Sequence, residues 1–142
     1  MIKIKPHTIK ETPCPKCGQV LETALLSNYC GADMRTVVVT EAEDDGSSAE
    51  YWALSFDSGY FKVNYCHKCG YNLSDRKNSA HCLLCADQKI DLEGSIFKKV
   101  NLATLTEIST GVRRKVIVYN DLLDNDEAKY VVSYCPICGK RM

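Results

Sequence analysis

The sequence predicts a mainly β fold built from two successive copies of one unit. Three observations predict it. The 142 residues contain four Cys-x-x-Cys pairs, the text around the second pair recurs around the fourth, and the segments between pairs alternate apolar with polar residues. Alternation with a period of two is typical of a strand that buries one face. We therefore expect antiparallel strands in two tandem lobes, each opened by one Cys pair and closed by another.

The repeat is clearest at the closing pairs. An offset of 69 residues superposes "VNYCHKCG" on "VSYCPICG". It places Tyr65 on Tyr134, Cys66 on Cys135, Cys69 on Cys138 and Gly70 on Gly139. An offset of 68 superposes the opening pairs, so that Cys14 and Cys17 fall on Cys82 and Cys85. Self-similarity at a fixed period indicates repeated structural units.

In the first copy, β-branched and aromatic residues predict strands over residues 35–42, 51–56 and 60–65. The acidic segment from Glu41 to Glu50 is expected to form a solvated tip between the first two of these strands. The segment from Gln19 to Leu26 fits either one helical turn or a strand. In the second copy, the predicted strands cover residues 95–100, 103–108, 112–119 and 129–134.

The predicted boundaries follow from the Cys pairs and from the polar segment between the copies. We call each Cys-x-x-Cys turn, with the residue after it where this is Gly, a knuckle. The expected organisation is a first lobe over residues 1–73 with knuckles at 14–18 and 66–70, a linker over 74–81, and a second lobe over 82–142 with knuckles at 82–85 and 135–139.

The cysteines point to metal binding. No apolar run approaches the ~20 residues that span a bilayer, and the basic N-terminal residues lack the apolar stretch of a secretion signal. We therefore expect a reducing cytoplasm, where thiols stay reduced and paired cysteines bind metal instead of forming disulfides. Cys30 has no partner in this spacing and is expected to be a small buried residue.

Four thiolates are the ligand set that tetrahedral Zn²⁺ prefers, and a knuckle supplies two of them. The expected ligands of two zinc ions are Cys14, Cys17, Cys66, Cys69, Cys82, Cys85, Cys135 and Cys138. Gly follows three of the four pairs and permits the positive φ that the turn requires. The pair in "CLLCA" is followed by Ala86, so this knuckle departs most from the pattern.

Two pairings of the knuckles are open. The sequential pairing joins the first knuckle with the second and the third with the fourth. The nested pairing joins the second with the third and the first with the fourth. The duplicated closing motif favours the sequential pairing. His67 and His81 adjoin cysteines and are alternative ligands, although eight cysteines already complete two sites.

A "CPxCG" knuckle, several strands and a closing "YCPxCG" resemble a zinc ribbon, and more narrowly the small zinc-ribbon proteins of bacteriophages and prophages. The resemblance covers residues 12–73 and again 80–142. It implies two zinc-ribbon-like lobes, each stapled by a metal site of four cysteines. Were the chain phage-encoded, it would act in the host cytoplasm on a partner in host machinery.

Charge bears on the type of partner. The 18 basic and 18 acidic residues balance, and eight thiolates with two Zn²⁺ would lower the net charge by four. Proteins that bind nucleic acid through phosphates usually carry the opposite balance. The basic residues that could nevertheless contact phosphates are Arg113, Arg114, Lys115, Lys140 and Arg141. Tyr60, Tyr71 and Tyr119 could stack on bases if exposed, or belong to the core.

The favoured function is therefore a non-enzymatic zinc-binding adaptor or inhibitor that docks on a protein partner. The alternative is a nucleic-acid-binding module of transcription, replication or repair. A rubredoxin-like iron site is a third hypothesis, since rubredoxins also hold their metal between two such knuckles. We expect no enzymatic activity, because no Ser-His-Asp set, phosphate loop or convincing pair of acids is present.

Overall fold

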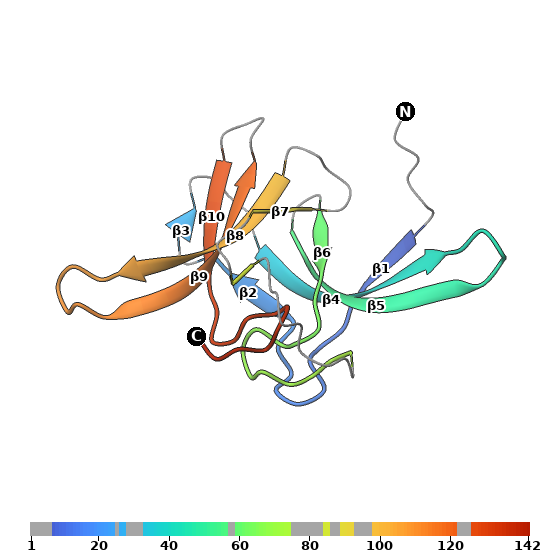
Figure 1. Ribbon diagram of the computed structural model, residues 1–142, viewed down its shortest axis with the longest axis horizontal. Helices are drawn as coiled ribbons and strands as arrows, with labels where there is room; N and C mark the ends of the chain where they lie inside the picture. The colour runs from blue at the N-terminus through green and yellow to red at the C-terminus, as the bar shows by residue number, and fades with distance from the viewer. Residues whose placement is uncertain are drawn as a thin grey trace.

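The computed structural model describes residues 7–24, 26–27, 33–56, 59–74, 84–85, 89–92, 98–121 and 126–142. Within these ranges the chain forms two antiparallel β-sheets and no helix (Figure 1). The prediction of a mainly β fold is thus confirmed. Among the described residues there is no apolar helix of the length needed to cross a membrane.

The first sheet is organised around a long hairpin. Its strands are β4 (Asp33–Ala42), β5 (Ser48–Ser55), β6 (Tyr60–Lys62), β1 (His7–Glu11) and β2 (Leu21–Thr23). β4 pairs with β5 along the hairpin, and β6 pairs with the other edge of β5. β1 and β2 lie one after the other along the free edge of β4.

The second sheet has the same kind of hairpin. Its strands are β8 (Lys98–Thr106), β9 (Arg113–Asp121), β10 (Asp126–Val131), β7 (Ile90–Asp91) and β3 (Leu26–Ser27). The order β7-β8-β9-β10 follows the same path as β2-β4-β5-β6 in the first sheet. This is the strand order that two copies of one unit would produce.

The halves do not form two clearly separate lobes. β3 belongs to the first half of the sequence, but it pairs with β10 of the second sheet. The linker predicted over residues 74–81 lies outside the described residues except for Ser74, so the proposed domain boundary stays a prediction.

One of two buried apolar clusters joins the two sheets. Met34, Leu54 and Phe56 bury their side chains from the first sheet, and Tyr119 and Tyr130 from the second. The Phe56 ring stacks on Tyr119 with centroids 5.0 Å apart and meets the edge of Tyr130 at 5.6 Å. Aromatic pairs in these arrangements add about 0.5–1.5 kcal/mol each beyond the burial of their area. The shared rings therefore hold the two sheets to one another.

Several predicted elements differ in detail. In the ambiguous segment from Gln19 to Leu26, the described residues contain β2 and the first residue of β3, and no helical turn. β8 is one strand where two were predicted, because Val100 and Leu102 continue the alternation across the predicted gap and are both buried. The acidic tip is also tighter than expected, since residues 41–42 and 48–50 belong to strands.

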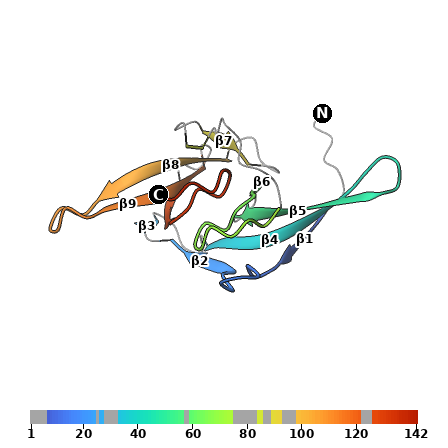
Figure 2. The ribbon, with the colours of Figure 1, turned by 60° about the horizontal axis from the view of Figure 1, so that its bottom comes forward.

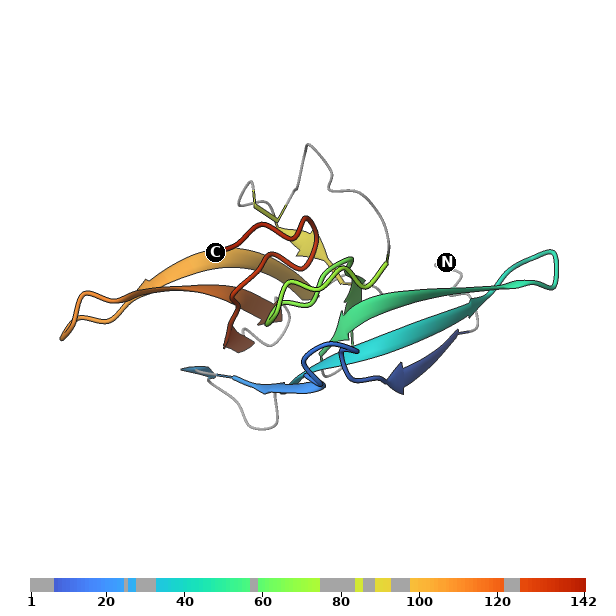
Figure 3. The ribbon, with the colours of Figure 1, turned by 90° about the horizontal axis from the view of Figure 1, so that it is seen from below.

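The two long hairpins project from opposite ends of the molecule (Figures 1 and 3). The β4–β5 hairpin ends at an acidic turn, and the β8–β9 hairpin ends at the turn of residues 107–112. The first, second and fourth knuckles and the C-terminus lie between the hairpins in both views, away from their tips. The arrangement is elongated, with these three knuckles near its middle.

Candidate metal centres

Three knuckles have the same backbone geometry. In each, the N–H of Gly donates to the carbonyl of the first Cys at 2.9 Å: Gly18 to Cys14, Gly70 to Cys66 and Gly139 to Cys135. These glycines have φ between 75° and 77°. This left-handed conformation is unfavourable for residues with a Cβ, which explains why Gly follows these pairs.

The first centre brings together Cys14, Cys17, Cys66 and Cys69. All four sulfur atoms lie within 4.8 Å of one another. The Sγ atoms of Cys14 and Cys69 are 3.6 Å apart, as are those of Cys17 and Cys66. Cys14 and Cys66 are buried, whereas Cys17 is exposed. The first two knuckles thus meet each other, as the sequential pairing requires.

The sulfur spacing fits a metal ion and not a disulfide. Four ligands about 2.3 Å from a tetrahedral Zn²⁺ would lie about 3.8 Å from one another. A disulfide would require about 2.05 Å, and none joins the cysteines that the structure describes. The first centre could therefore hold one metal ion, coordinated entirely by protein thiolates.

Backbone N–H groups face the sulfurs of the first centre. Burial alone would raise the pKa of Cys14, but N–H groups of Cys17 and Lys16 donate to its sulfur, and the net pKa is about 7. Burial raises the pKa of Cys66 despite similar bonds from Cys69 and Lys68. A bound cation would favour the thiolate form of all four ligands.

The second centre contains Cys85, Cys135 and Cys138, whose sulfur atoms also lie within 4.8 Å of one another. Cys85 and Cys138 have their Sγ atoms 3.4 Å apart. Cys82 and Ala86, together with the alternative ligand His81, lie outside the described residues. The three described cysteines are the ones that the sequential pairing places together, and the two groups could bind metal ions.

The irregular knuckle has a structural explanation at Leu84. Its side chain is fully buried in the shared core. Lys16 and Lys68, at the corresponding positions of the first two knuckles, are exposed. Ile137 in the fourth knuckle packs against the same core. The second centre is therefore attached to the apolar interior, whereas the first faces solvent on its lysine side.

The two closing knuckles lie against each other in a reciprocal arrangement (Figure 2). The carbonyl of Pro136 accepts the N–H groups of Asn64 and Tyr65 at 2.8 and 3.0 Å. The carbonyl of His67 accepts those of Ser133 and Tyr134 at 2.9 and 3.0 Å. An offset of 69 relates the two sets of bonds: Asn64 and Tyr65 correspond to Ser133 and Tyr134, and the acceptor His67 corresponds to the acceptor Pro136. Such reciprocity is the mark of a two-fold related interface.

Two tyrosine rings complete this interface. A Cβ built on Gly70 would lie 2.7 Å from Cδ1 of Tyr134, and one built on Gly139 would lie 2.8 Å from Cδ1 of Tyr65. Both glycines therefore serve two purposes: they adopt positive φ and leave room for a ring. Sequence reasoning missed this contact, although the exact recurrence of Tyr and Gly at the same offset was its signal.

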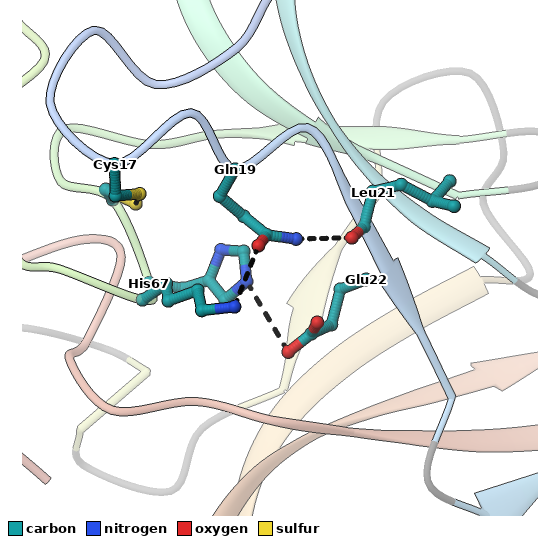
Figure 4. A network of polar contacts seen from close by, with 7 residues as sticks. Cys17, Gln19, Leu21, Glu22 and His67 are labelled. Carbon is teal, nitrogen blue, oxygen red and sulfur yellow. Dashed lines mark hydrogen bonds and ion pairs between the residues drawn. The ribbon is translucent and has the colours of Figure 1, made fainter.

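His67 is not among the grouped metal ligands. Its ring is buried, and its Nε2 lies 3.9 Å from Oε1 of Glu22 (Figure 4). Burial, with a smaller effect of Lys68, lowers the pKa of His67 to about 4, which keeps the ring neutral. Lys68 donates to Gln19 at 3.2 Å, which links the first two knuckles beside the first centre.

The basic candidates occupy two separate regions. Arg113, Arg114 and Lys115 are exposed on the β8–β9 hairpin, and Lys140 and Arg141 are exposed after the last knuckle. In Figures 1 and 3 the hairpin tip extends away from the C-terminus. These residues therefore do not form one continuous basic patch.

The remaining candidates also separate. Tyr60 and Tyr119 are buried, as a role in the core predicts, whereas Tyr71 is 41% exposed. Cys30 lies outside the described residues. Comparison of the chain with family models, with curated proteins and with solved structures finds no match.

Proposed function

We propose that this chain is a non-enzymatic protein in which two structural zinc ions hold a β scaffold that docks on a protein partner. The observation that carries the proposal is the first centre, where four protein thiols surround one position. A catalytic zinc keeps a coordination position open for water or substrate. A site filled by four thiolates instead stabilises the fold.

Metal binding is favoured over disulfide formation by the reducing cytoplasm expected for a chain with this cysteine pattern, and a structural metal also meets the requirement for stability. Halves of this size bury too little surface to be comfortably stable alone. A structural zinc contributes about 10–16 kcal/mol of apparent binding free energy that is coupled to folding. A rubredoxin-like iron protein would be red, so the absorption spectrum of the purified protein separates the two metals.

The projecting hairpins support docking. Residues 104–115 of the β8–β9 hairpin are exposed apart from the partly covered Leu105, and Ile108 at the turn is 100% exposed. A fully exposed large apolar residue on a projecting element is suited to contact with another protein. The resemblance to phage zinc-ribbon proteins is the basis for placing that partner in host machinery.

Metal analysis and an affinity capture test the proposal together. Purified protein is expected to contain about two zinc ions per chain and to be colourless. Immobilised zinc-loaded protein should retain a specific host protein after nuclease treatment. Ile108→Ser, with full zinc content, should weaken that retention, whereas Lys16→Ala, also exposed, should leave it unchanged. Retention of no protein at all, with zinc fully bound, would contradict docking.

Nucleic-acid binding is the second candidate, favoured by one observation. Arg113, Arg114 and Lys115 are all exposed on a two-stranded ribbon, an element that fits the major groove of DNA. Affinity would then fall steeply with salt. Absence of binding to duplex DNA or to RNA at about 0.05 M salt would exclude this candidate.

A further inference from the structure

The end of the β8–β9 hairpin carries charges without partners. We call residues 104–115 the basic ribbon. Arg113, Arg114 and Lys115 form no ion pair with any residue that the structure describes. In the register of the hairpin, Arg113 and Lys115 share one face of the ribbon with Thr104 and Thr106. Arg114 lies on the other face, so both faces are basic.

The opposite hairpin carries the complementary charge. We call residues 41–50 the acidic tip. It contains Glu41, Glu43, Asp44, Asp45 and Glu50, and neither Lys nor Arg occurs between Arg35 and Lys62. Asp44, Asp45 and Glu50 are exposed. The basic ribbon and the acidic tip project from opposite ends of the molecule (Figures 1 and 3), so they cannot neutralise each other within one chain.

Both charged ends also offer an open strand edge. β10 pairs with β9 only as far as Val116, and Val132 donates to the carbonyl of Lys115. β6 pairs with β5 only from Ala53 onward, and Val63 donates to Trp52. Among the described residues, positions 113–114 of β9 and 48–51 of β5 therefore have a neighbouring strand on one side only. An open edge accepts another strand through its backbone groups.

We propose that the basic ribbon docks on the acidic tip of a second copy of this chain, so that molecules associate head to tail. Edge pairing of β9 with β5 would bring Arg113–Lys115 beside Glu50. Two basic ribbons, or two acidic tips, repel each other, so charge selects this arrangement against the symmetric ones. A head-to-tail contact leaves one free end of each kind and extends into chains of molecules.

This inference goes beyond the proposed function and concerns the purified protein alone. Its test is sedimentation velocity of the zinc-loaded full-length chain. At about 0.02 M NaCl the weight-average sedimentation coefficient should rise with protein concentration past the value of a dimer, and the association constant should fall roughly tenfold or more by about 0.5 M NaCl. A wild-type chain that stays monomeric at low salt and high concentration overturns the proposal.

Two variants make the test specific. Asp44→Asn with Asp45→Asn and Glu50→Gln neutralises the exposed acids of the acidic tip, and Arg113→Glu with Arg114→Glu disables the basic ribbon. Each variant alone should remain monomeric, because head-to-tail pairing needs both a basic ribbon and an acidic tip and each variant retains only one of them. An equimolar mixture should form dimers and nothing larger, since only the ribbon of one and the tip of the other can pair. Larger species in the mixture contradict the proposal.

A charge-matched control excludes a general effect of net charge. Lys140→Glu with Arg141→Glu also reverses exposed basic residues, but away from both hairpin ends. This variant should associate as the wild type does. Zinc content and far-UV circular dichroism confirm that every variant is folded. Equal loss of association in the control and in the ribbon variant would show that the ribbon is not the contact. Lysate capture of a host protein is a separate measurement, so the two proposals can fail independently.

Discussion

Individual glycines show how one residue type can meet different requirements. Gly18, Gly70 and Gly139 have nearly identical positive φ angles. Nothing lies within 4 Å of a Cβ built on Gly18, whereas one on Gly70 would meet the ring of Tyr134. The backbone conformation alone explains why residue 18 is glycine. At positions 70 and 139, glycine is also required by the packing of a tyrosine ring from the other half.

Alanine at Gly18 and at Gly70 should therefore differ in cost. Gly18→Ala is expected to lower the free energy of unfolding by about 1–2 kcal/mol, the cost of a left-handed Cβ. Gly70→Ala should cost about 1–3 kcal/mol more, because the Tyr134 ring must also move. Urea unfolding of the zinc-loaded variants measures both. Equal losses would mean that the ring contact contributes nothing.

Asp45 provides a pH-dependent measurement on the acidic tip. Its carboxylate accepts hydrogen bonds from the hydroxyl and the N–H of Ser47, and these lower its pKa. Because the folded pKa is depressed, the bonds stabilise the turn above the unfolded pKa and are lost as pH falls through the folded pKa. Carboxyl NMR titration should place Asp45 below an unstructured Asp. Ser47→Ala should raise its midpoint, and an unchanged midpoint would contradict this account.

At the scale of the element, the third knuckle illustrates how packing overrides a local pattern. "CLLCA" lacks the polar residue of the first two knuckles because Leu84 belongs to the shared core. Cys85, which belongs to a group of thiols that could hold a metal ion, and Leu84, whose side chain fills the core, are thus adjacent in one short segment.

Leu84→Ala should lower the free energy of unfolding by about 2–5 kcal/mol, the usual cost of a cavity at a fully buried leucine. Lys16→Ala, at the corresponding exposed position of the first knuckle, should change it by less than about 0.5 kcal/mol. Denaturant unfolding in excess zinc gives both values. A small loss at Leu84 would show that the knuckle is not anchored in the core.

The sequence predicted where the strands lie better than it predicted which segments contact each other. Alternating residues located the strands of both hairpins, and the duplicated closing motif favoured the sequential pairing, in which the seven grouped cysteines are found. The pairing of β3 with β10 had no local signal, because Leu26 and Lys129 are brought together only by the tertiary fold. The burial of Leu84 was missed for a related reason. Two adjacent leucines in a turn do not reveal which core they face.

At the scale of the whole molecule, the metal centres and the sheets depend on each other. The first centre joins residues before β2 to residues after β6, and the second joins residues before β7 to residues after β10. Each ion would therefore close one half of the chain into a loop. The shared aromatic core and the reciprocal knuckle contacts then join the two halves.

Removing selected knuckles should report the pairing directly. Replacing the four cysteines of the first and second knuckles by serine removes one centre under the sequential pairing and should leave about one zinc ion per chain. Replacing those of the first and fourth knuckles disrupts both centres and should leave none. Metal analysis of the purified variants measures this. The nested pairing predicts the reverse, so that result would overturn the assignment of both centres.

The reciprocal contact between closing knuckles also constrains the order of folding. Tyr65 packs on Gly139, which lies 74 residues later in the chain. During synthesis the first half can assemble its own thiols long before that glycine exists. Until Gly139 is translated, the ring of Tyr65 stays uncovered and the first half contains only its own part of the shared core. Contacts between residues so far apart in sequence also form slowly. The chain is therefore most prone to aggregation between the synthesis of its second knuckle and the synthesis of its last.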